Sequence, residues 1–132
     1  MLRILFLSLF FFAVIVSFGQ TQLELNQTAY ADFQKADKEL NTAYQTILKE
    51  YKKDTAFVKN LKIVQKIWIQ FRDAEMKMKY PDREKGYYGS IQPMCWSMYL
   101  KELTEERTKK LKNWLVSSDE GDVCSGSIKA KN

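Results

Sequence analysis

The residue types that carry most enzyme chemistry are scarce in this chain. It has no histidine, which removes the commonest general base and metal ligand, and only two cysteines, Cys95 and Cys124. Asp73 and Glu75 stand two positions apart, so a helix would turn them to different faces, which does not support paired acid–base catalysis. We therefore predict a protein that is not an enzyme, with no catalytic residue, no metal and no cofactor.

Residue types suited to binding gather in and beside one short segment, residues 80–96, which contains two glycines. Tyrosine and tryptophan beside glycines are typical recognition anchors. Such residues also often cover the open end of a small helical core, so the sequence leaves both interpretations open. The candidate partner-binding residues are Tyr80, Arg83, Lys85, Tyr87, Tyr88 and Trp96.

Polar residues interrupt the apolar stripes of the chain, and a half-buried charge must find a partner. One interpretation is a polar network that fixes the register of the helices, and the other is a binding cleft lined by Arg72, Glu75 and Arg107. The six network residues are Asp37, Asn41, Gln65, Arg72, Glu75 and Arg107.

Three runs of apolar residues recur with alternating steps of four and three, which predicts three amphipathic helices. The connection near Lys53 and Asp54 is very short, so the first two helices should form an antiparallel hairpin. Equal rise along both helices would place Asp37 level with Arg72, and we predict an ion pair between them. The predicted fold class is all-α: an antiparallel three-helix domain made of a helical hairpin plus a third helix.

Residues 1–19 have the order of a secretory signal peptide. Arg3 supplies a positive charge, an apolar stretch follows, and Ser17 and Gly19 are the small residues of a cleavage site. The stretch is shorter than the roughly 20 apolar residues of a membrane span, so we predict no stable span. The expected product is periplasmic or extracellular, with a helical domain over residues 20–116 and a flexible polar tail over residues 117–132. Because that compartment is oxidising, we also predict a disulfide between Cys95 and Cys124.

The net charge of the chain is positive, and it can be interpreted in two ways. The formal charge is +5, and removing Arg3 with the leader leaves +4. The basic residues are scattered among acidic ones, which favours a plain soluble surface over a dedicated anion site. A small basic protein also adheres to anionic cell-wall polymers or lipids. No nucleic-acid-binding motif occurs, so no nucleic-acid partner is predicted, and the sequence indicates no oligomeric state.

Four motifs in order resemble those of a known family. A first-helix motif precedes a central Q-x-x-W-x-x-[FY]-R-D-A-E pattern, and a loop motif and a third-helix motif follow it. The matching segments are Asn26–Ala29 with Ala36–Asn41 and Tyr44, Gln65–Glu75, Gly89–Met94, and Leu103–Arg107. Together they are similar to the LprI-like family, named after a mycobacterial lipoprotein described as a lysozyme inhibitor. The resemblance covers about residues 23–115 and implies an α-helical, exported bacterial protein.

The resemblance also implies lysozyme inhibition. Family members commonly have cysteine where this chain has Thr28, Met76 and Tyr99, so the family's disulfide arrangement is not carried over. The predicted function is an exported, non-enzymatic binding protein, with a lysozyme or a cell-wall component as partner. The alternative is a structural or envelope-associated helical module without lysozyme binding. A basic lysozyme would repel a +4 chain at long range, which weighs against the first interpretation.

Overall fold

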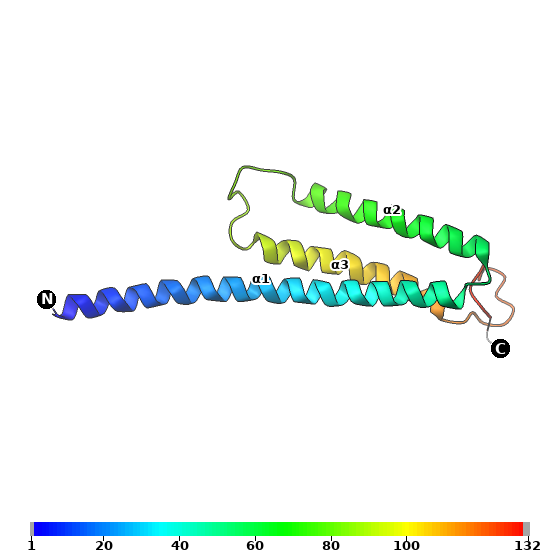
Figure 1. Ribbon diagram of the computed structural model, residues 1–132, viewed down its shortest axis with the longest axis horizontal. Helices are drawn as coiled ribbons and strands as arrows, with labels where there is room; N and C mark the ends of the chain where they lie inside the picture. Colours follow the sequence, from blue (N-terminus) through cyan, green and yellow to red (C-terminus); the bar gives the residue numbers. More distant parts are fainter. Residues whose placement is uncertain (1, 131–132) are drawn as a thin grey trace.

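The computed structural model of this chain describes the backbone of residues 2–130 and the side chains of residues 21–130. It is all-α in its described part, as predicted, with α1 (Leu2–Glu50), α2 (Thr55–Lys79) and α3 (Gln92–Lys112) followed by a short 3-10 turn, η1 (Asn113–Leu115). Figure 1 shows α2 running back antiparallel to α1, and α3 returning parallel to α1. The predicted signal peptide falls in the first part of α1, whose side chains lie outside the described residues.

Small side chains bring α1 and α3 together. Ala29, Ala36 and Ala43 recur every seven residues on α1 and are buried, and Ser97 and Thr104 are buried at the same spacing on α3. Without bulky side chains between them the two backbones can approach closely. The main helix–helix contact of the molecule is therefore α1 with α3, rather than the predicted α1–α2 hairpin contact.

The two buried threonine hydroxyls of α3 are satisfied within their own helix. Thr104 Oγ1 donates to the Leu100 carbonyl at 2.7 Å, and Thr108 Oγ1 donates to the Thr104 carbonyl at 2.8 Å. Because a buried hydroxyl without a hydrogen bond would destabilise the fold, this back-bonding is what lets threonine line a helix interface.

The apolar core lies where the end of α1, the start of α2 and the end of α3 meet. Ile47, Leu61 and Leu111 are buried there. The Tyr51 hydroxyl donates to the Trp114 carbonyl at 2.7 Å, and the Phe57 ring lies between, 4.3 Å from the Tyr51 centroid and 5.1 Å from that of Trp114. All three helices are thus anchored to one another at this end.

The C-terminal segment, which we expected to be a flexible tail, folds back onto the same end. Ser118 pairs with Ala130 in an isolated bridge, and the Ser118 amide donates to the Lys129 carbonyl at 2.9 Å. The Lys129 ammonium donates to the Glu50 carbonyl at 2.6 Å. The segment therefore caps the end of α1 up to residue 130, the last one described.

The predicted disulfide between Cys95 and Cys124 is absent, and both cysteines are free. Cys95 lies in the first turn of α3, whereas the segment holding Cys124 is tied to the opposite end of that helix. The stretch from Cys95 to Lys112 spans about 25 Å of helix, and a disulfide needs Cα atoms within about 7 Å. The flexible tail that the prediction assumed would have had to cross this distance.

Both thiols should therefore react with a maleimide before any reduction. Cys95→Ser with Cys124→Ser should change the free energy of unfolding by less than about 1 kcal/mol, because neither substitution opens a covalent loop. Loss of a native disulfide would cost about 2–5 kcal/mol. Mass spectrometry of the labelled protein counts the reactive thiols, and urea unfolding measures the change in the free energy of unfolding. An unreactive thiol pair would contradict the structure.

Candidate binding site

The connection between α2 and α3 is a braced loop. The Tyr88 hydroxyl donates to the Pro81 carbonyl at 2.7 Å, which joins its two sides. The Tyr87 amide donates to the Glu84 carbonyl, and Gly89 donates to Gly86, both at 3.0 Å. Gly86 and Gly89 have φ values of 86° and 72°, a left-handed conformation that glycine adopts without strain. The glycines seen in the sequence therefore make the bends of this loop.

The structure brings four of the predicted aromatic residues together. Tyr80 is the residue that caps the end of α2, and its ring centroid lies 5.6 Å from that of Trp96 in the first turns of α3. Tyr88 meets Tyr80 edge-on at 5.7 Å, and Tyr87 meets Tyr88 edge-on at 4.9 Å. Edge-on contacts of this kind stabilise aromatic clusters beyond the area they bury.

The cluster has a supporting part and a projecting part. Tyr80, Tyr88 and Trp96 are half-buried, whereas the Tyr87 side chain is 68% exposed. The Arg83 guanidinium lies 5.8 Å from the Tyr87 ring centroid, within the range of a cation–π contact. Lys85 is exposed, and with the other loop residues it lines a shallow hollow of about 320 Å³.

Two tyrosines of this region keep their protons at neutral pH. Burial, with smaller effects from Cys95 and Tyr88, raises the pKa of Tyr80 above its ordinary value. The Tyr99 hydroxyl donates to Glu75 Oε1 at 2.7 Å, and this bond raises the pKa of Tyr99. Both hydroxyls are therefore neutral, and that of Tyr99 is a hydrogen-bond donor.

Three of the six residues of the predicted polar network make hydrogen bonds between α2 and α3. Arg107 Nε donates to Gln65 Oε1 at 3.0 Å, and the Glu75–Tyr99 bond is the second link between the two helices. Gln65, Glu75 and Arg107 are thus brought to one interface.

The predicted ion pair between Asp37 and Arg72 does not form. Arg72 Nη2 lies 2.8 Å from Asp73 Oδ1 in its own helix, and Asp37 accepts from Asn41 Nδ2 at 3.1 Å. Asn41, which donates this bond, lies in α1 as Asp37 does, so the bond stays within that helix. The reason is that α1 packs on α3, so its polar face does not reach α2.

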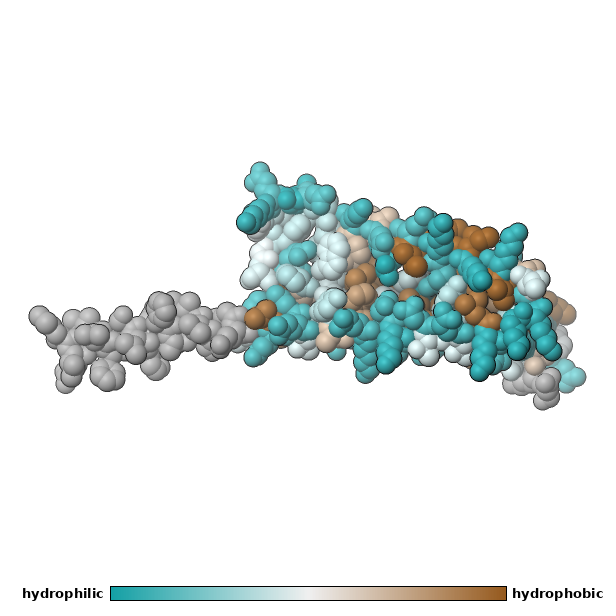
Figure 2. All heavy atoms as spheres, viewed as in Figure 1, coloured by the Kyte–Doolittle hydropathy of each residue, from teal (hydrophilic) through white to brown (hydrophobic). Residues whose placement is uncertain are grey.

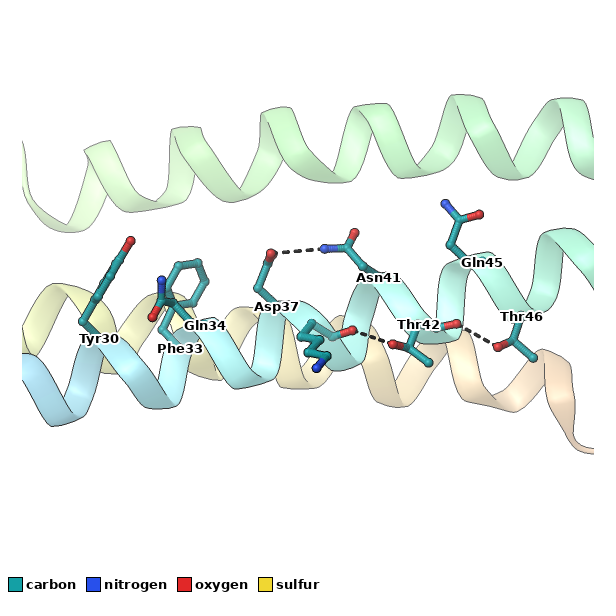
Figure 3. Close-up of a pocket in the computed structure, with 9 residues that line it drawn as sticks. Tyr30, Phe33, Gln34, Asp37, Asn41, Thr42, Gln45 and Thr46 are labelled. Carbon is teal, nitrogen blue, oxygen red and sulfur yellow. Dashed lines mark hydrogen bonds between the residues drawn. The ribbon is translucent and has the colours of Figure 1, made fainter.

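Figure 3 shows Asp37 and Asn41 projecting from α1 toward α2, with Asn41 Nδ2 donating to Asp37 Oδ2. They line an open groove of about 690 Å³ along α1, together with Tyr30, Phe33, Gln45 and neighbouring residues. The groove is wide and shallow, and its polar groups are already partly paired within the helix.

The Trp68 ring lies in a second groove and is within cation–π distance of two guanidinium groups. The Arg72 and Arg107 guanidinium carbons lie 5.4 and 5.9 Å from the Trp68 ring centroid. Phe71 and Leu103 continue this groove of about 500 Å³ between α2 and α3. Burial lowers the pKa of Arg107, and no carboxylate among the described residues lies within ion-pair distance of it.

A comparison with protein families decides the relationship. The family described as "Lysozyme inhibitor LprI" matches residues 17–111, which include α2, the loop and nearly all of α3. The chain belongs to the LprI family. An uncharacterized protein of Rhizobium meliloti (strain 1021) is 31% identical over 110 residues, covering 75% of this LprI-family chain and 77% of that protein. No solved structure matches the chain.

All the candidate residues of the loop and the polar network lie inside the LprI match, whereas Cys124 and the C-terminal segment lie outside it. In the part of this LprI-family chain whose side chains are described, no helix carries an apolar stretch long enough to cross a bilayer.

Three contacts of the loop end were not anticipated from the sequence. Asn26 Nδ2 donates to the Ser90 carbonyl at 3.1 Å and ties α1 to the loop. The Lys79 ammonium lies 3.4 Å from the centroid of the Tyr99 ring, and the hydroxyl of Tyr99 donates to Glu75. These pairs join residues far apart in the chain, and no spacing motif marks them.

Proposed function

We propose that this chain is exported and inhibits a lysozyme without doing chemistry itself, by placing the loop of residues 80–90 in the enzyme's substrate cleft. The observation that carries the proposal is the exposed Tyr87 ring with the Arg83 guanidinium against it, on a loop braced by the Tyr88–Pro81 bond. The family description supports lysozyme as the partner. The leader supports export, because its order of charge, apolar stretch and small residues is that of a signal peptide.

The chemistry of the loop suits a lysozyme cleft. Glycosidases of this kind act with a pair of carboxylates flanking the scissile bond. A guanidinium placed between them would form charge-assisted hydrogen bonds, and an aromatic ring beside it would fill a sugar subsite. A rigid loop loses little conformational entropy on binding, so bracing by Tyr88 favours affinity.

Inhibition assays with the exported protein test the proposal. Its mass is measured first, and it is then added to lysozymes of several classes acting on peptidoglycan. We expect inhibition of at least one class, with a direct complex visible by calorimetry. Since the chain is basic, the association rate with a basic lysozyme should rise as salt screens the repulsion. Full activity of every class at saturating protein would refute the proposal.

A further inference from the structure

Helix α2 carries a second apolar face that points away from the protein. Ile63, Val64, Ile67, Phe71 and Met78 are between 47% and 69% exposed. At 100° per residue they fall on one side of the helix, together with two small alanines. Figure 2 shows apolar atoms interrupting the hydrophilic surface over α2.

Helix α2 is apolar on two sides. Toward the core it buries Leu61 and Met76 beside the polar Gln65, and toward solvent it places isoleucine and phenylalanine as well. A surface helix normally turns its apolar stripe to the core and its polar face to water. A contiguous apolar stripe left outside marks an interaction surface.

Lysines border this stripe on both edges. On α2, Lys59, Lys66 and Lys77 are exposed along the edge away from α3. On the other edge, Lys109 and Lys110 of α3 line the groove that Phe71 and Trp68 share. The whole of α2 is basic, because it has six basic residues and two acidic ones, Asp73 and Glu75.

Arg107 adds a cation without a carboxylate partner. It lines the same groove, its Nε is held by Gln65, and among the described residues no carboxylate lies within ion-pair distance of it. A half-buried guanidinium normally finds an anion, and here the groove leaves it open to one from outside.

We infer that the outward face of α2, with the groove toward α3, docks on the surface of an anionic lipid bilayer. A helix with an apolar face bordered by lysines lies in the membrane interface, its apolar side chains among the upper acyl chains and its lysines at the lipid phosphates. Arg107 lines the groove, so its guanidinium would contact a headgroup phosphate that enters the groove. The inference goes beyond the proposed lysozyme inhibition and does not depend on it.

The charge of the borders selects this occupant over a second copy of the chain. If two such faces met, each lysine border would lie against the lysine border of the other copy, and like charges would oppose association. An anionic bilayer meets both borders with the opposite charge. It also accepts the apolar stripe at any lateral position, so no shaped pocket is needed.

Flotation with vesicles tests the inference. The exported protein is mixed with phosphatidylcholine vesicles, with or without phosphatidylglycerol, and the bound fraction is measured at low and high salt. We expect strong binding to the phosphatidylglycerol vesicles at low salt and weak binding to the neutral ones. Any lipid affinity of the N-terminal segment is common to all variants and cancels in their comparison.

Two variants separate the apolar and the charged contributions. Ile67→Gln with Phe71→Gln should weaken binding at least about tenfold, and because both residues are more than half exposed the fold should stay intact. Lys59→Gln, Lys66→Gln and Lys77→Gln together should weaken binding about a hundredfold at low salt and reduce its salt dependence. The matched control changes the same number of exposed α1 and turn lysines, Lys35, Lys49 and Lys52, to glutamine and should keep nearly all of the binding.

Equal flotation of the wild type and the Ile67→Gln, Phe71→Gln variant would overturn the inference, as would equal losses in the lysine variant and its control. Sedimentation without lipid tests whether the face binds a second copy of the chain. If the wild type is a dimer and the Ile67→Gln, Phe71→Gln variant is not, the face would be assigned to self-association instead. Circular dichroism verifies that each variant is folded. Lysozyme inhibition by these variants should be unchanged, so a failure here is distinguishable from a failure of the proposed function.

Discussion

The double variant Tyr87→Ala, Arg83→Ala should inhibit lysozyme about a hundredfold less well than the unaltered chain. Tyr87 is the most exposed aromatic ring of the loop, and Arg83 lies against it, so the variant removes the projecting ring and its cation together. Anchors of this type each contribute about 2 kcal/mol or more to an interface. The inhibition constant, measured against the class of lysozyme that the wild type blocks, gives the result.

Two controls separate the anchor from its support. Tyr30→Ala with Lys35→Ala removes another exposed tyrosine and another cation, on α1, and should leave inhibition unchanged. Tyr88→Phe removes only the hydroxyl that bonds Pro81, so it should loosen the loop and weaken inhibition less than the anchor variant. Undiminished inhibition by a folded Tyr87→Ala, Arg83→Ala protein would place the contact elsewhere on the molecule.

Replacing Ala36 and Ala43 together with leucine should destabilise the domain by about 2–6 kcal/mol. Both side chains are buried where α1 meets α3, and larger ones would push the two backbones apart. Urea unfolding followed by circular dichroism measures the loss. The control is Ala31→Leu on the exposed side of the same helix, which should change the free energy of unfolding by less than about 0.5 kcal/mol. A double variant as stable as the wild type would show that this interface is not closely packed.

The number of helices and their order could be predicted from the sequence, because apolar spacing and the short turn at Lys53 and Asp54 are local signals. Which helix packs against α1 could not be predicted in this way. The short turn favoured α2 as the neighbour of α1, yet α1 packs on α3 through alanine, serine and threonine. An apolar stripe shows which side of a helix is buried, but it does not show which of the other helices covers that side.

The candidate site divides in the same way. Tyr80, Tyr88 and Trp96 could be selected as a group because they are close in sequence and beside glycines. The ion pair of Asp37 with Arg72 was wrong because it required α1 and α2 to touch along their length, while a carboxylate one residue away was free to pair with Arg72. Contacts such as Lys79 with Tyr99 depend on the final helix positions and leave no trace in spacing.

The parallel pairing of α1 with α3 affects the order in which the chain can fold. The bond from Tyr51 to Trp114 joins residues 63 positions apart, and the whole of α2 and the loop must be synthesised before it can form. Until α3 leaves the ribosome, the alanine face of α1 has no partner, and α2 does not cover it. A nascent chain therefore stays unassembled until its last third is made, which is the condition in which a polypeptide can still be threaded through a secretion channel.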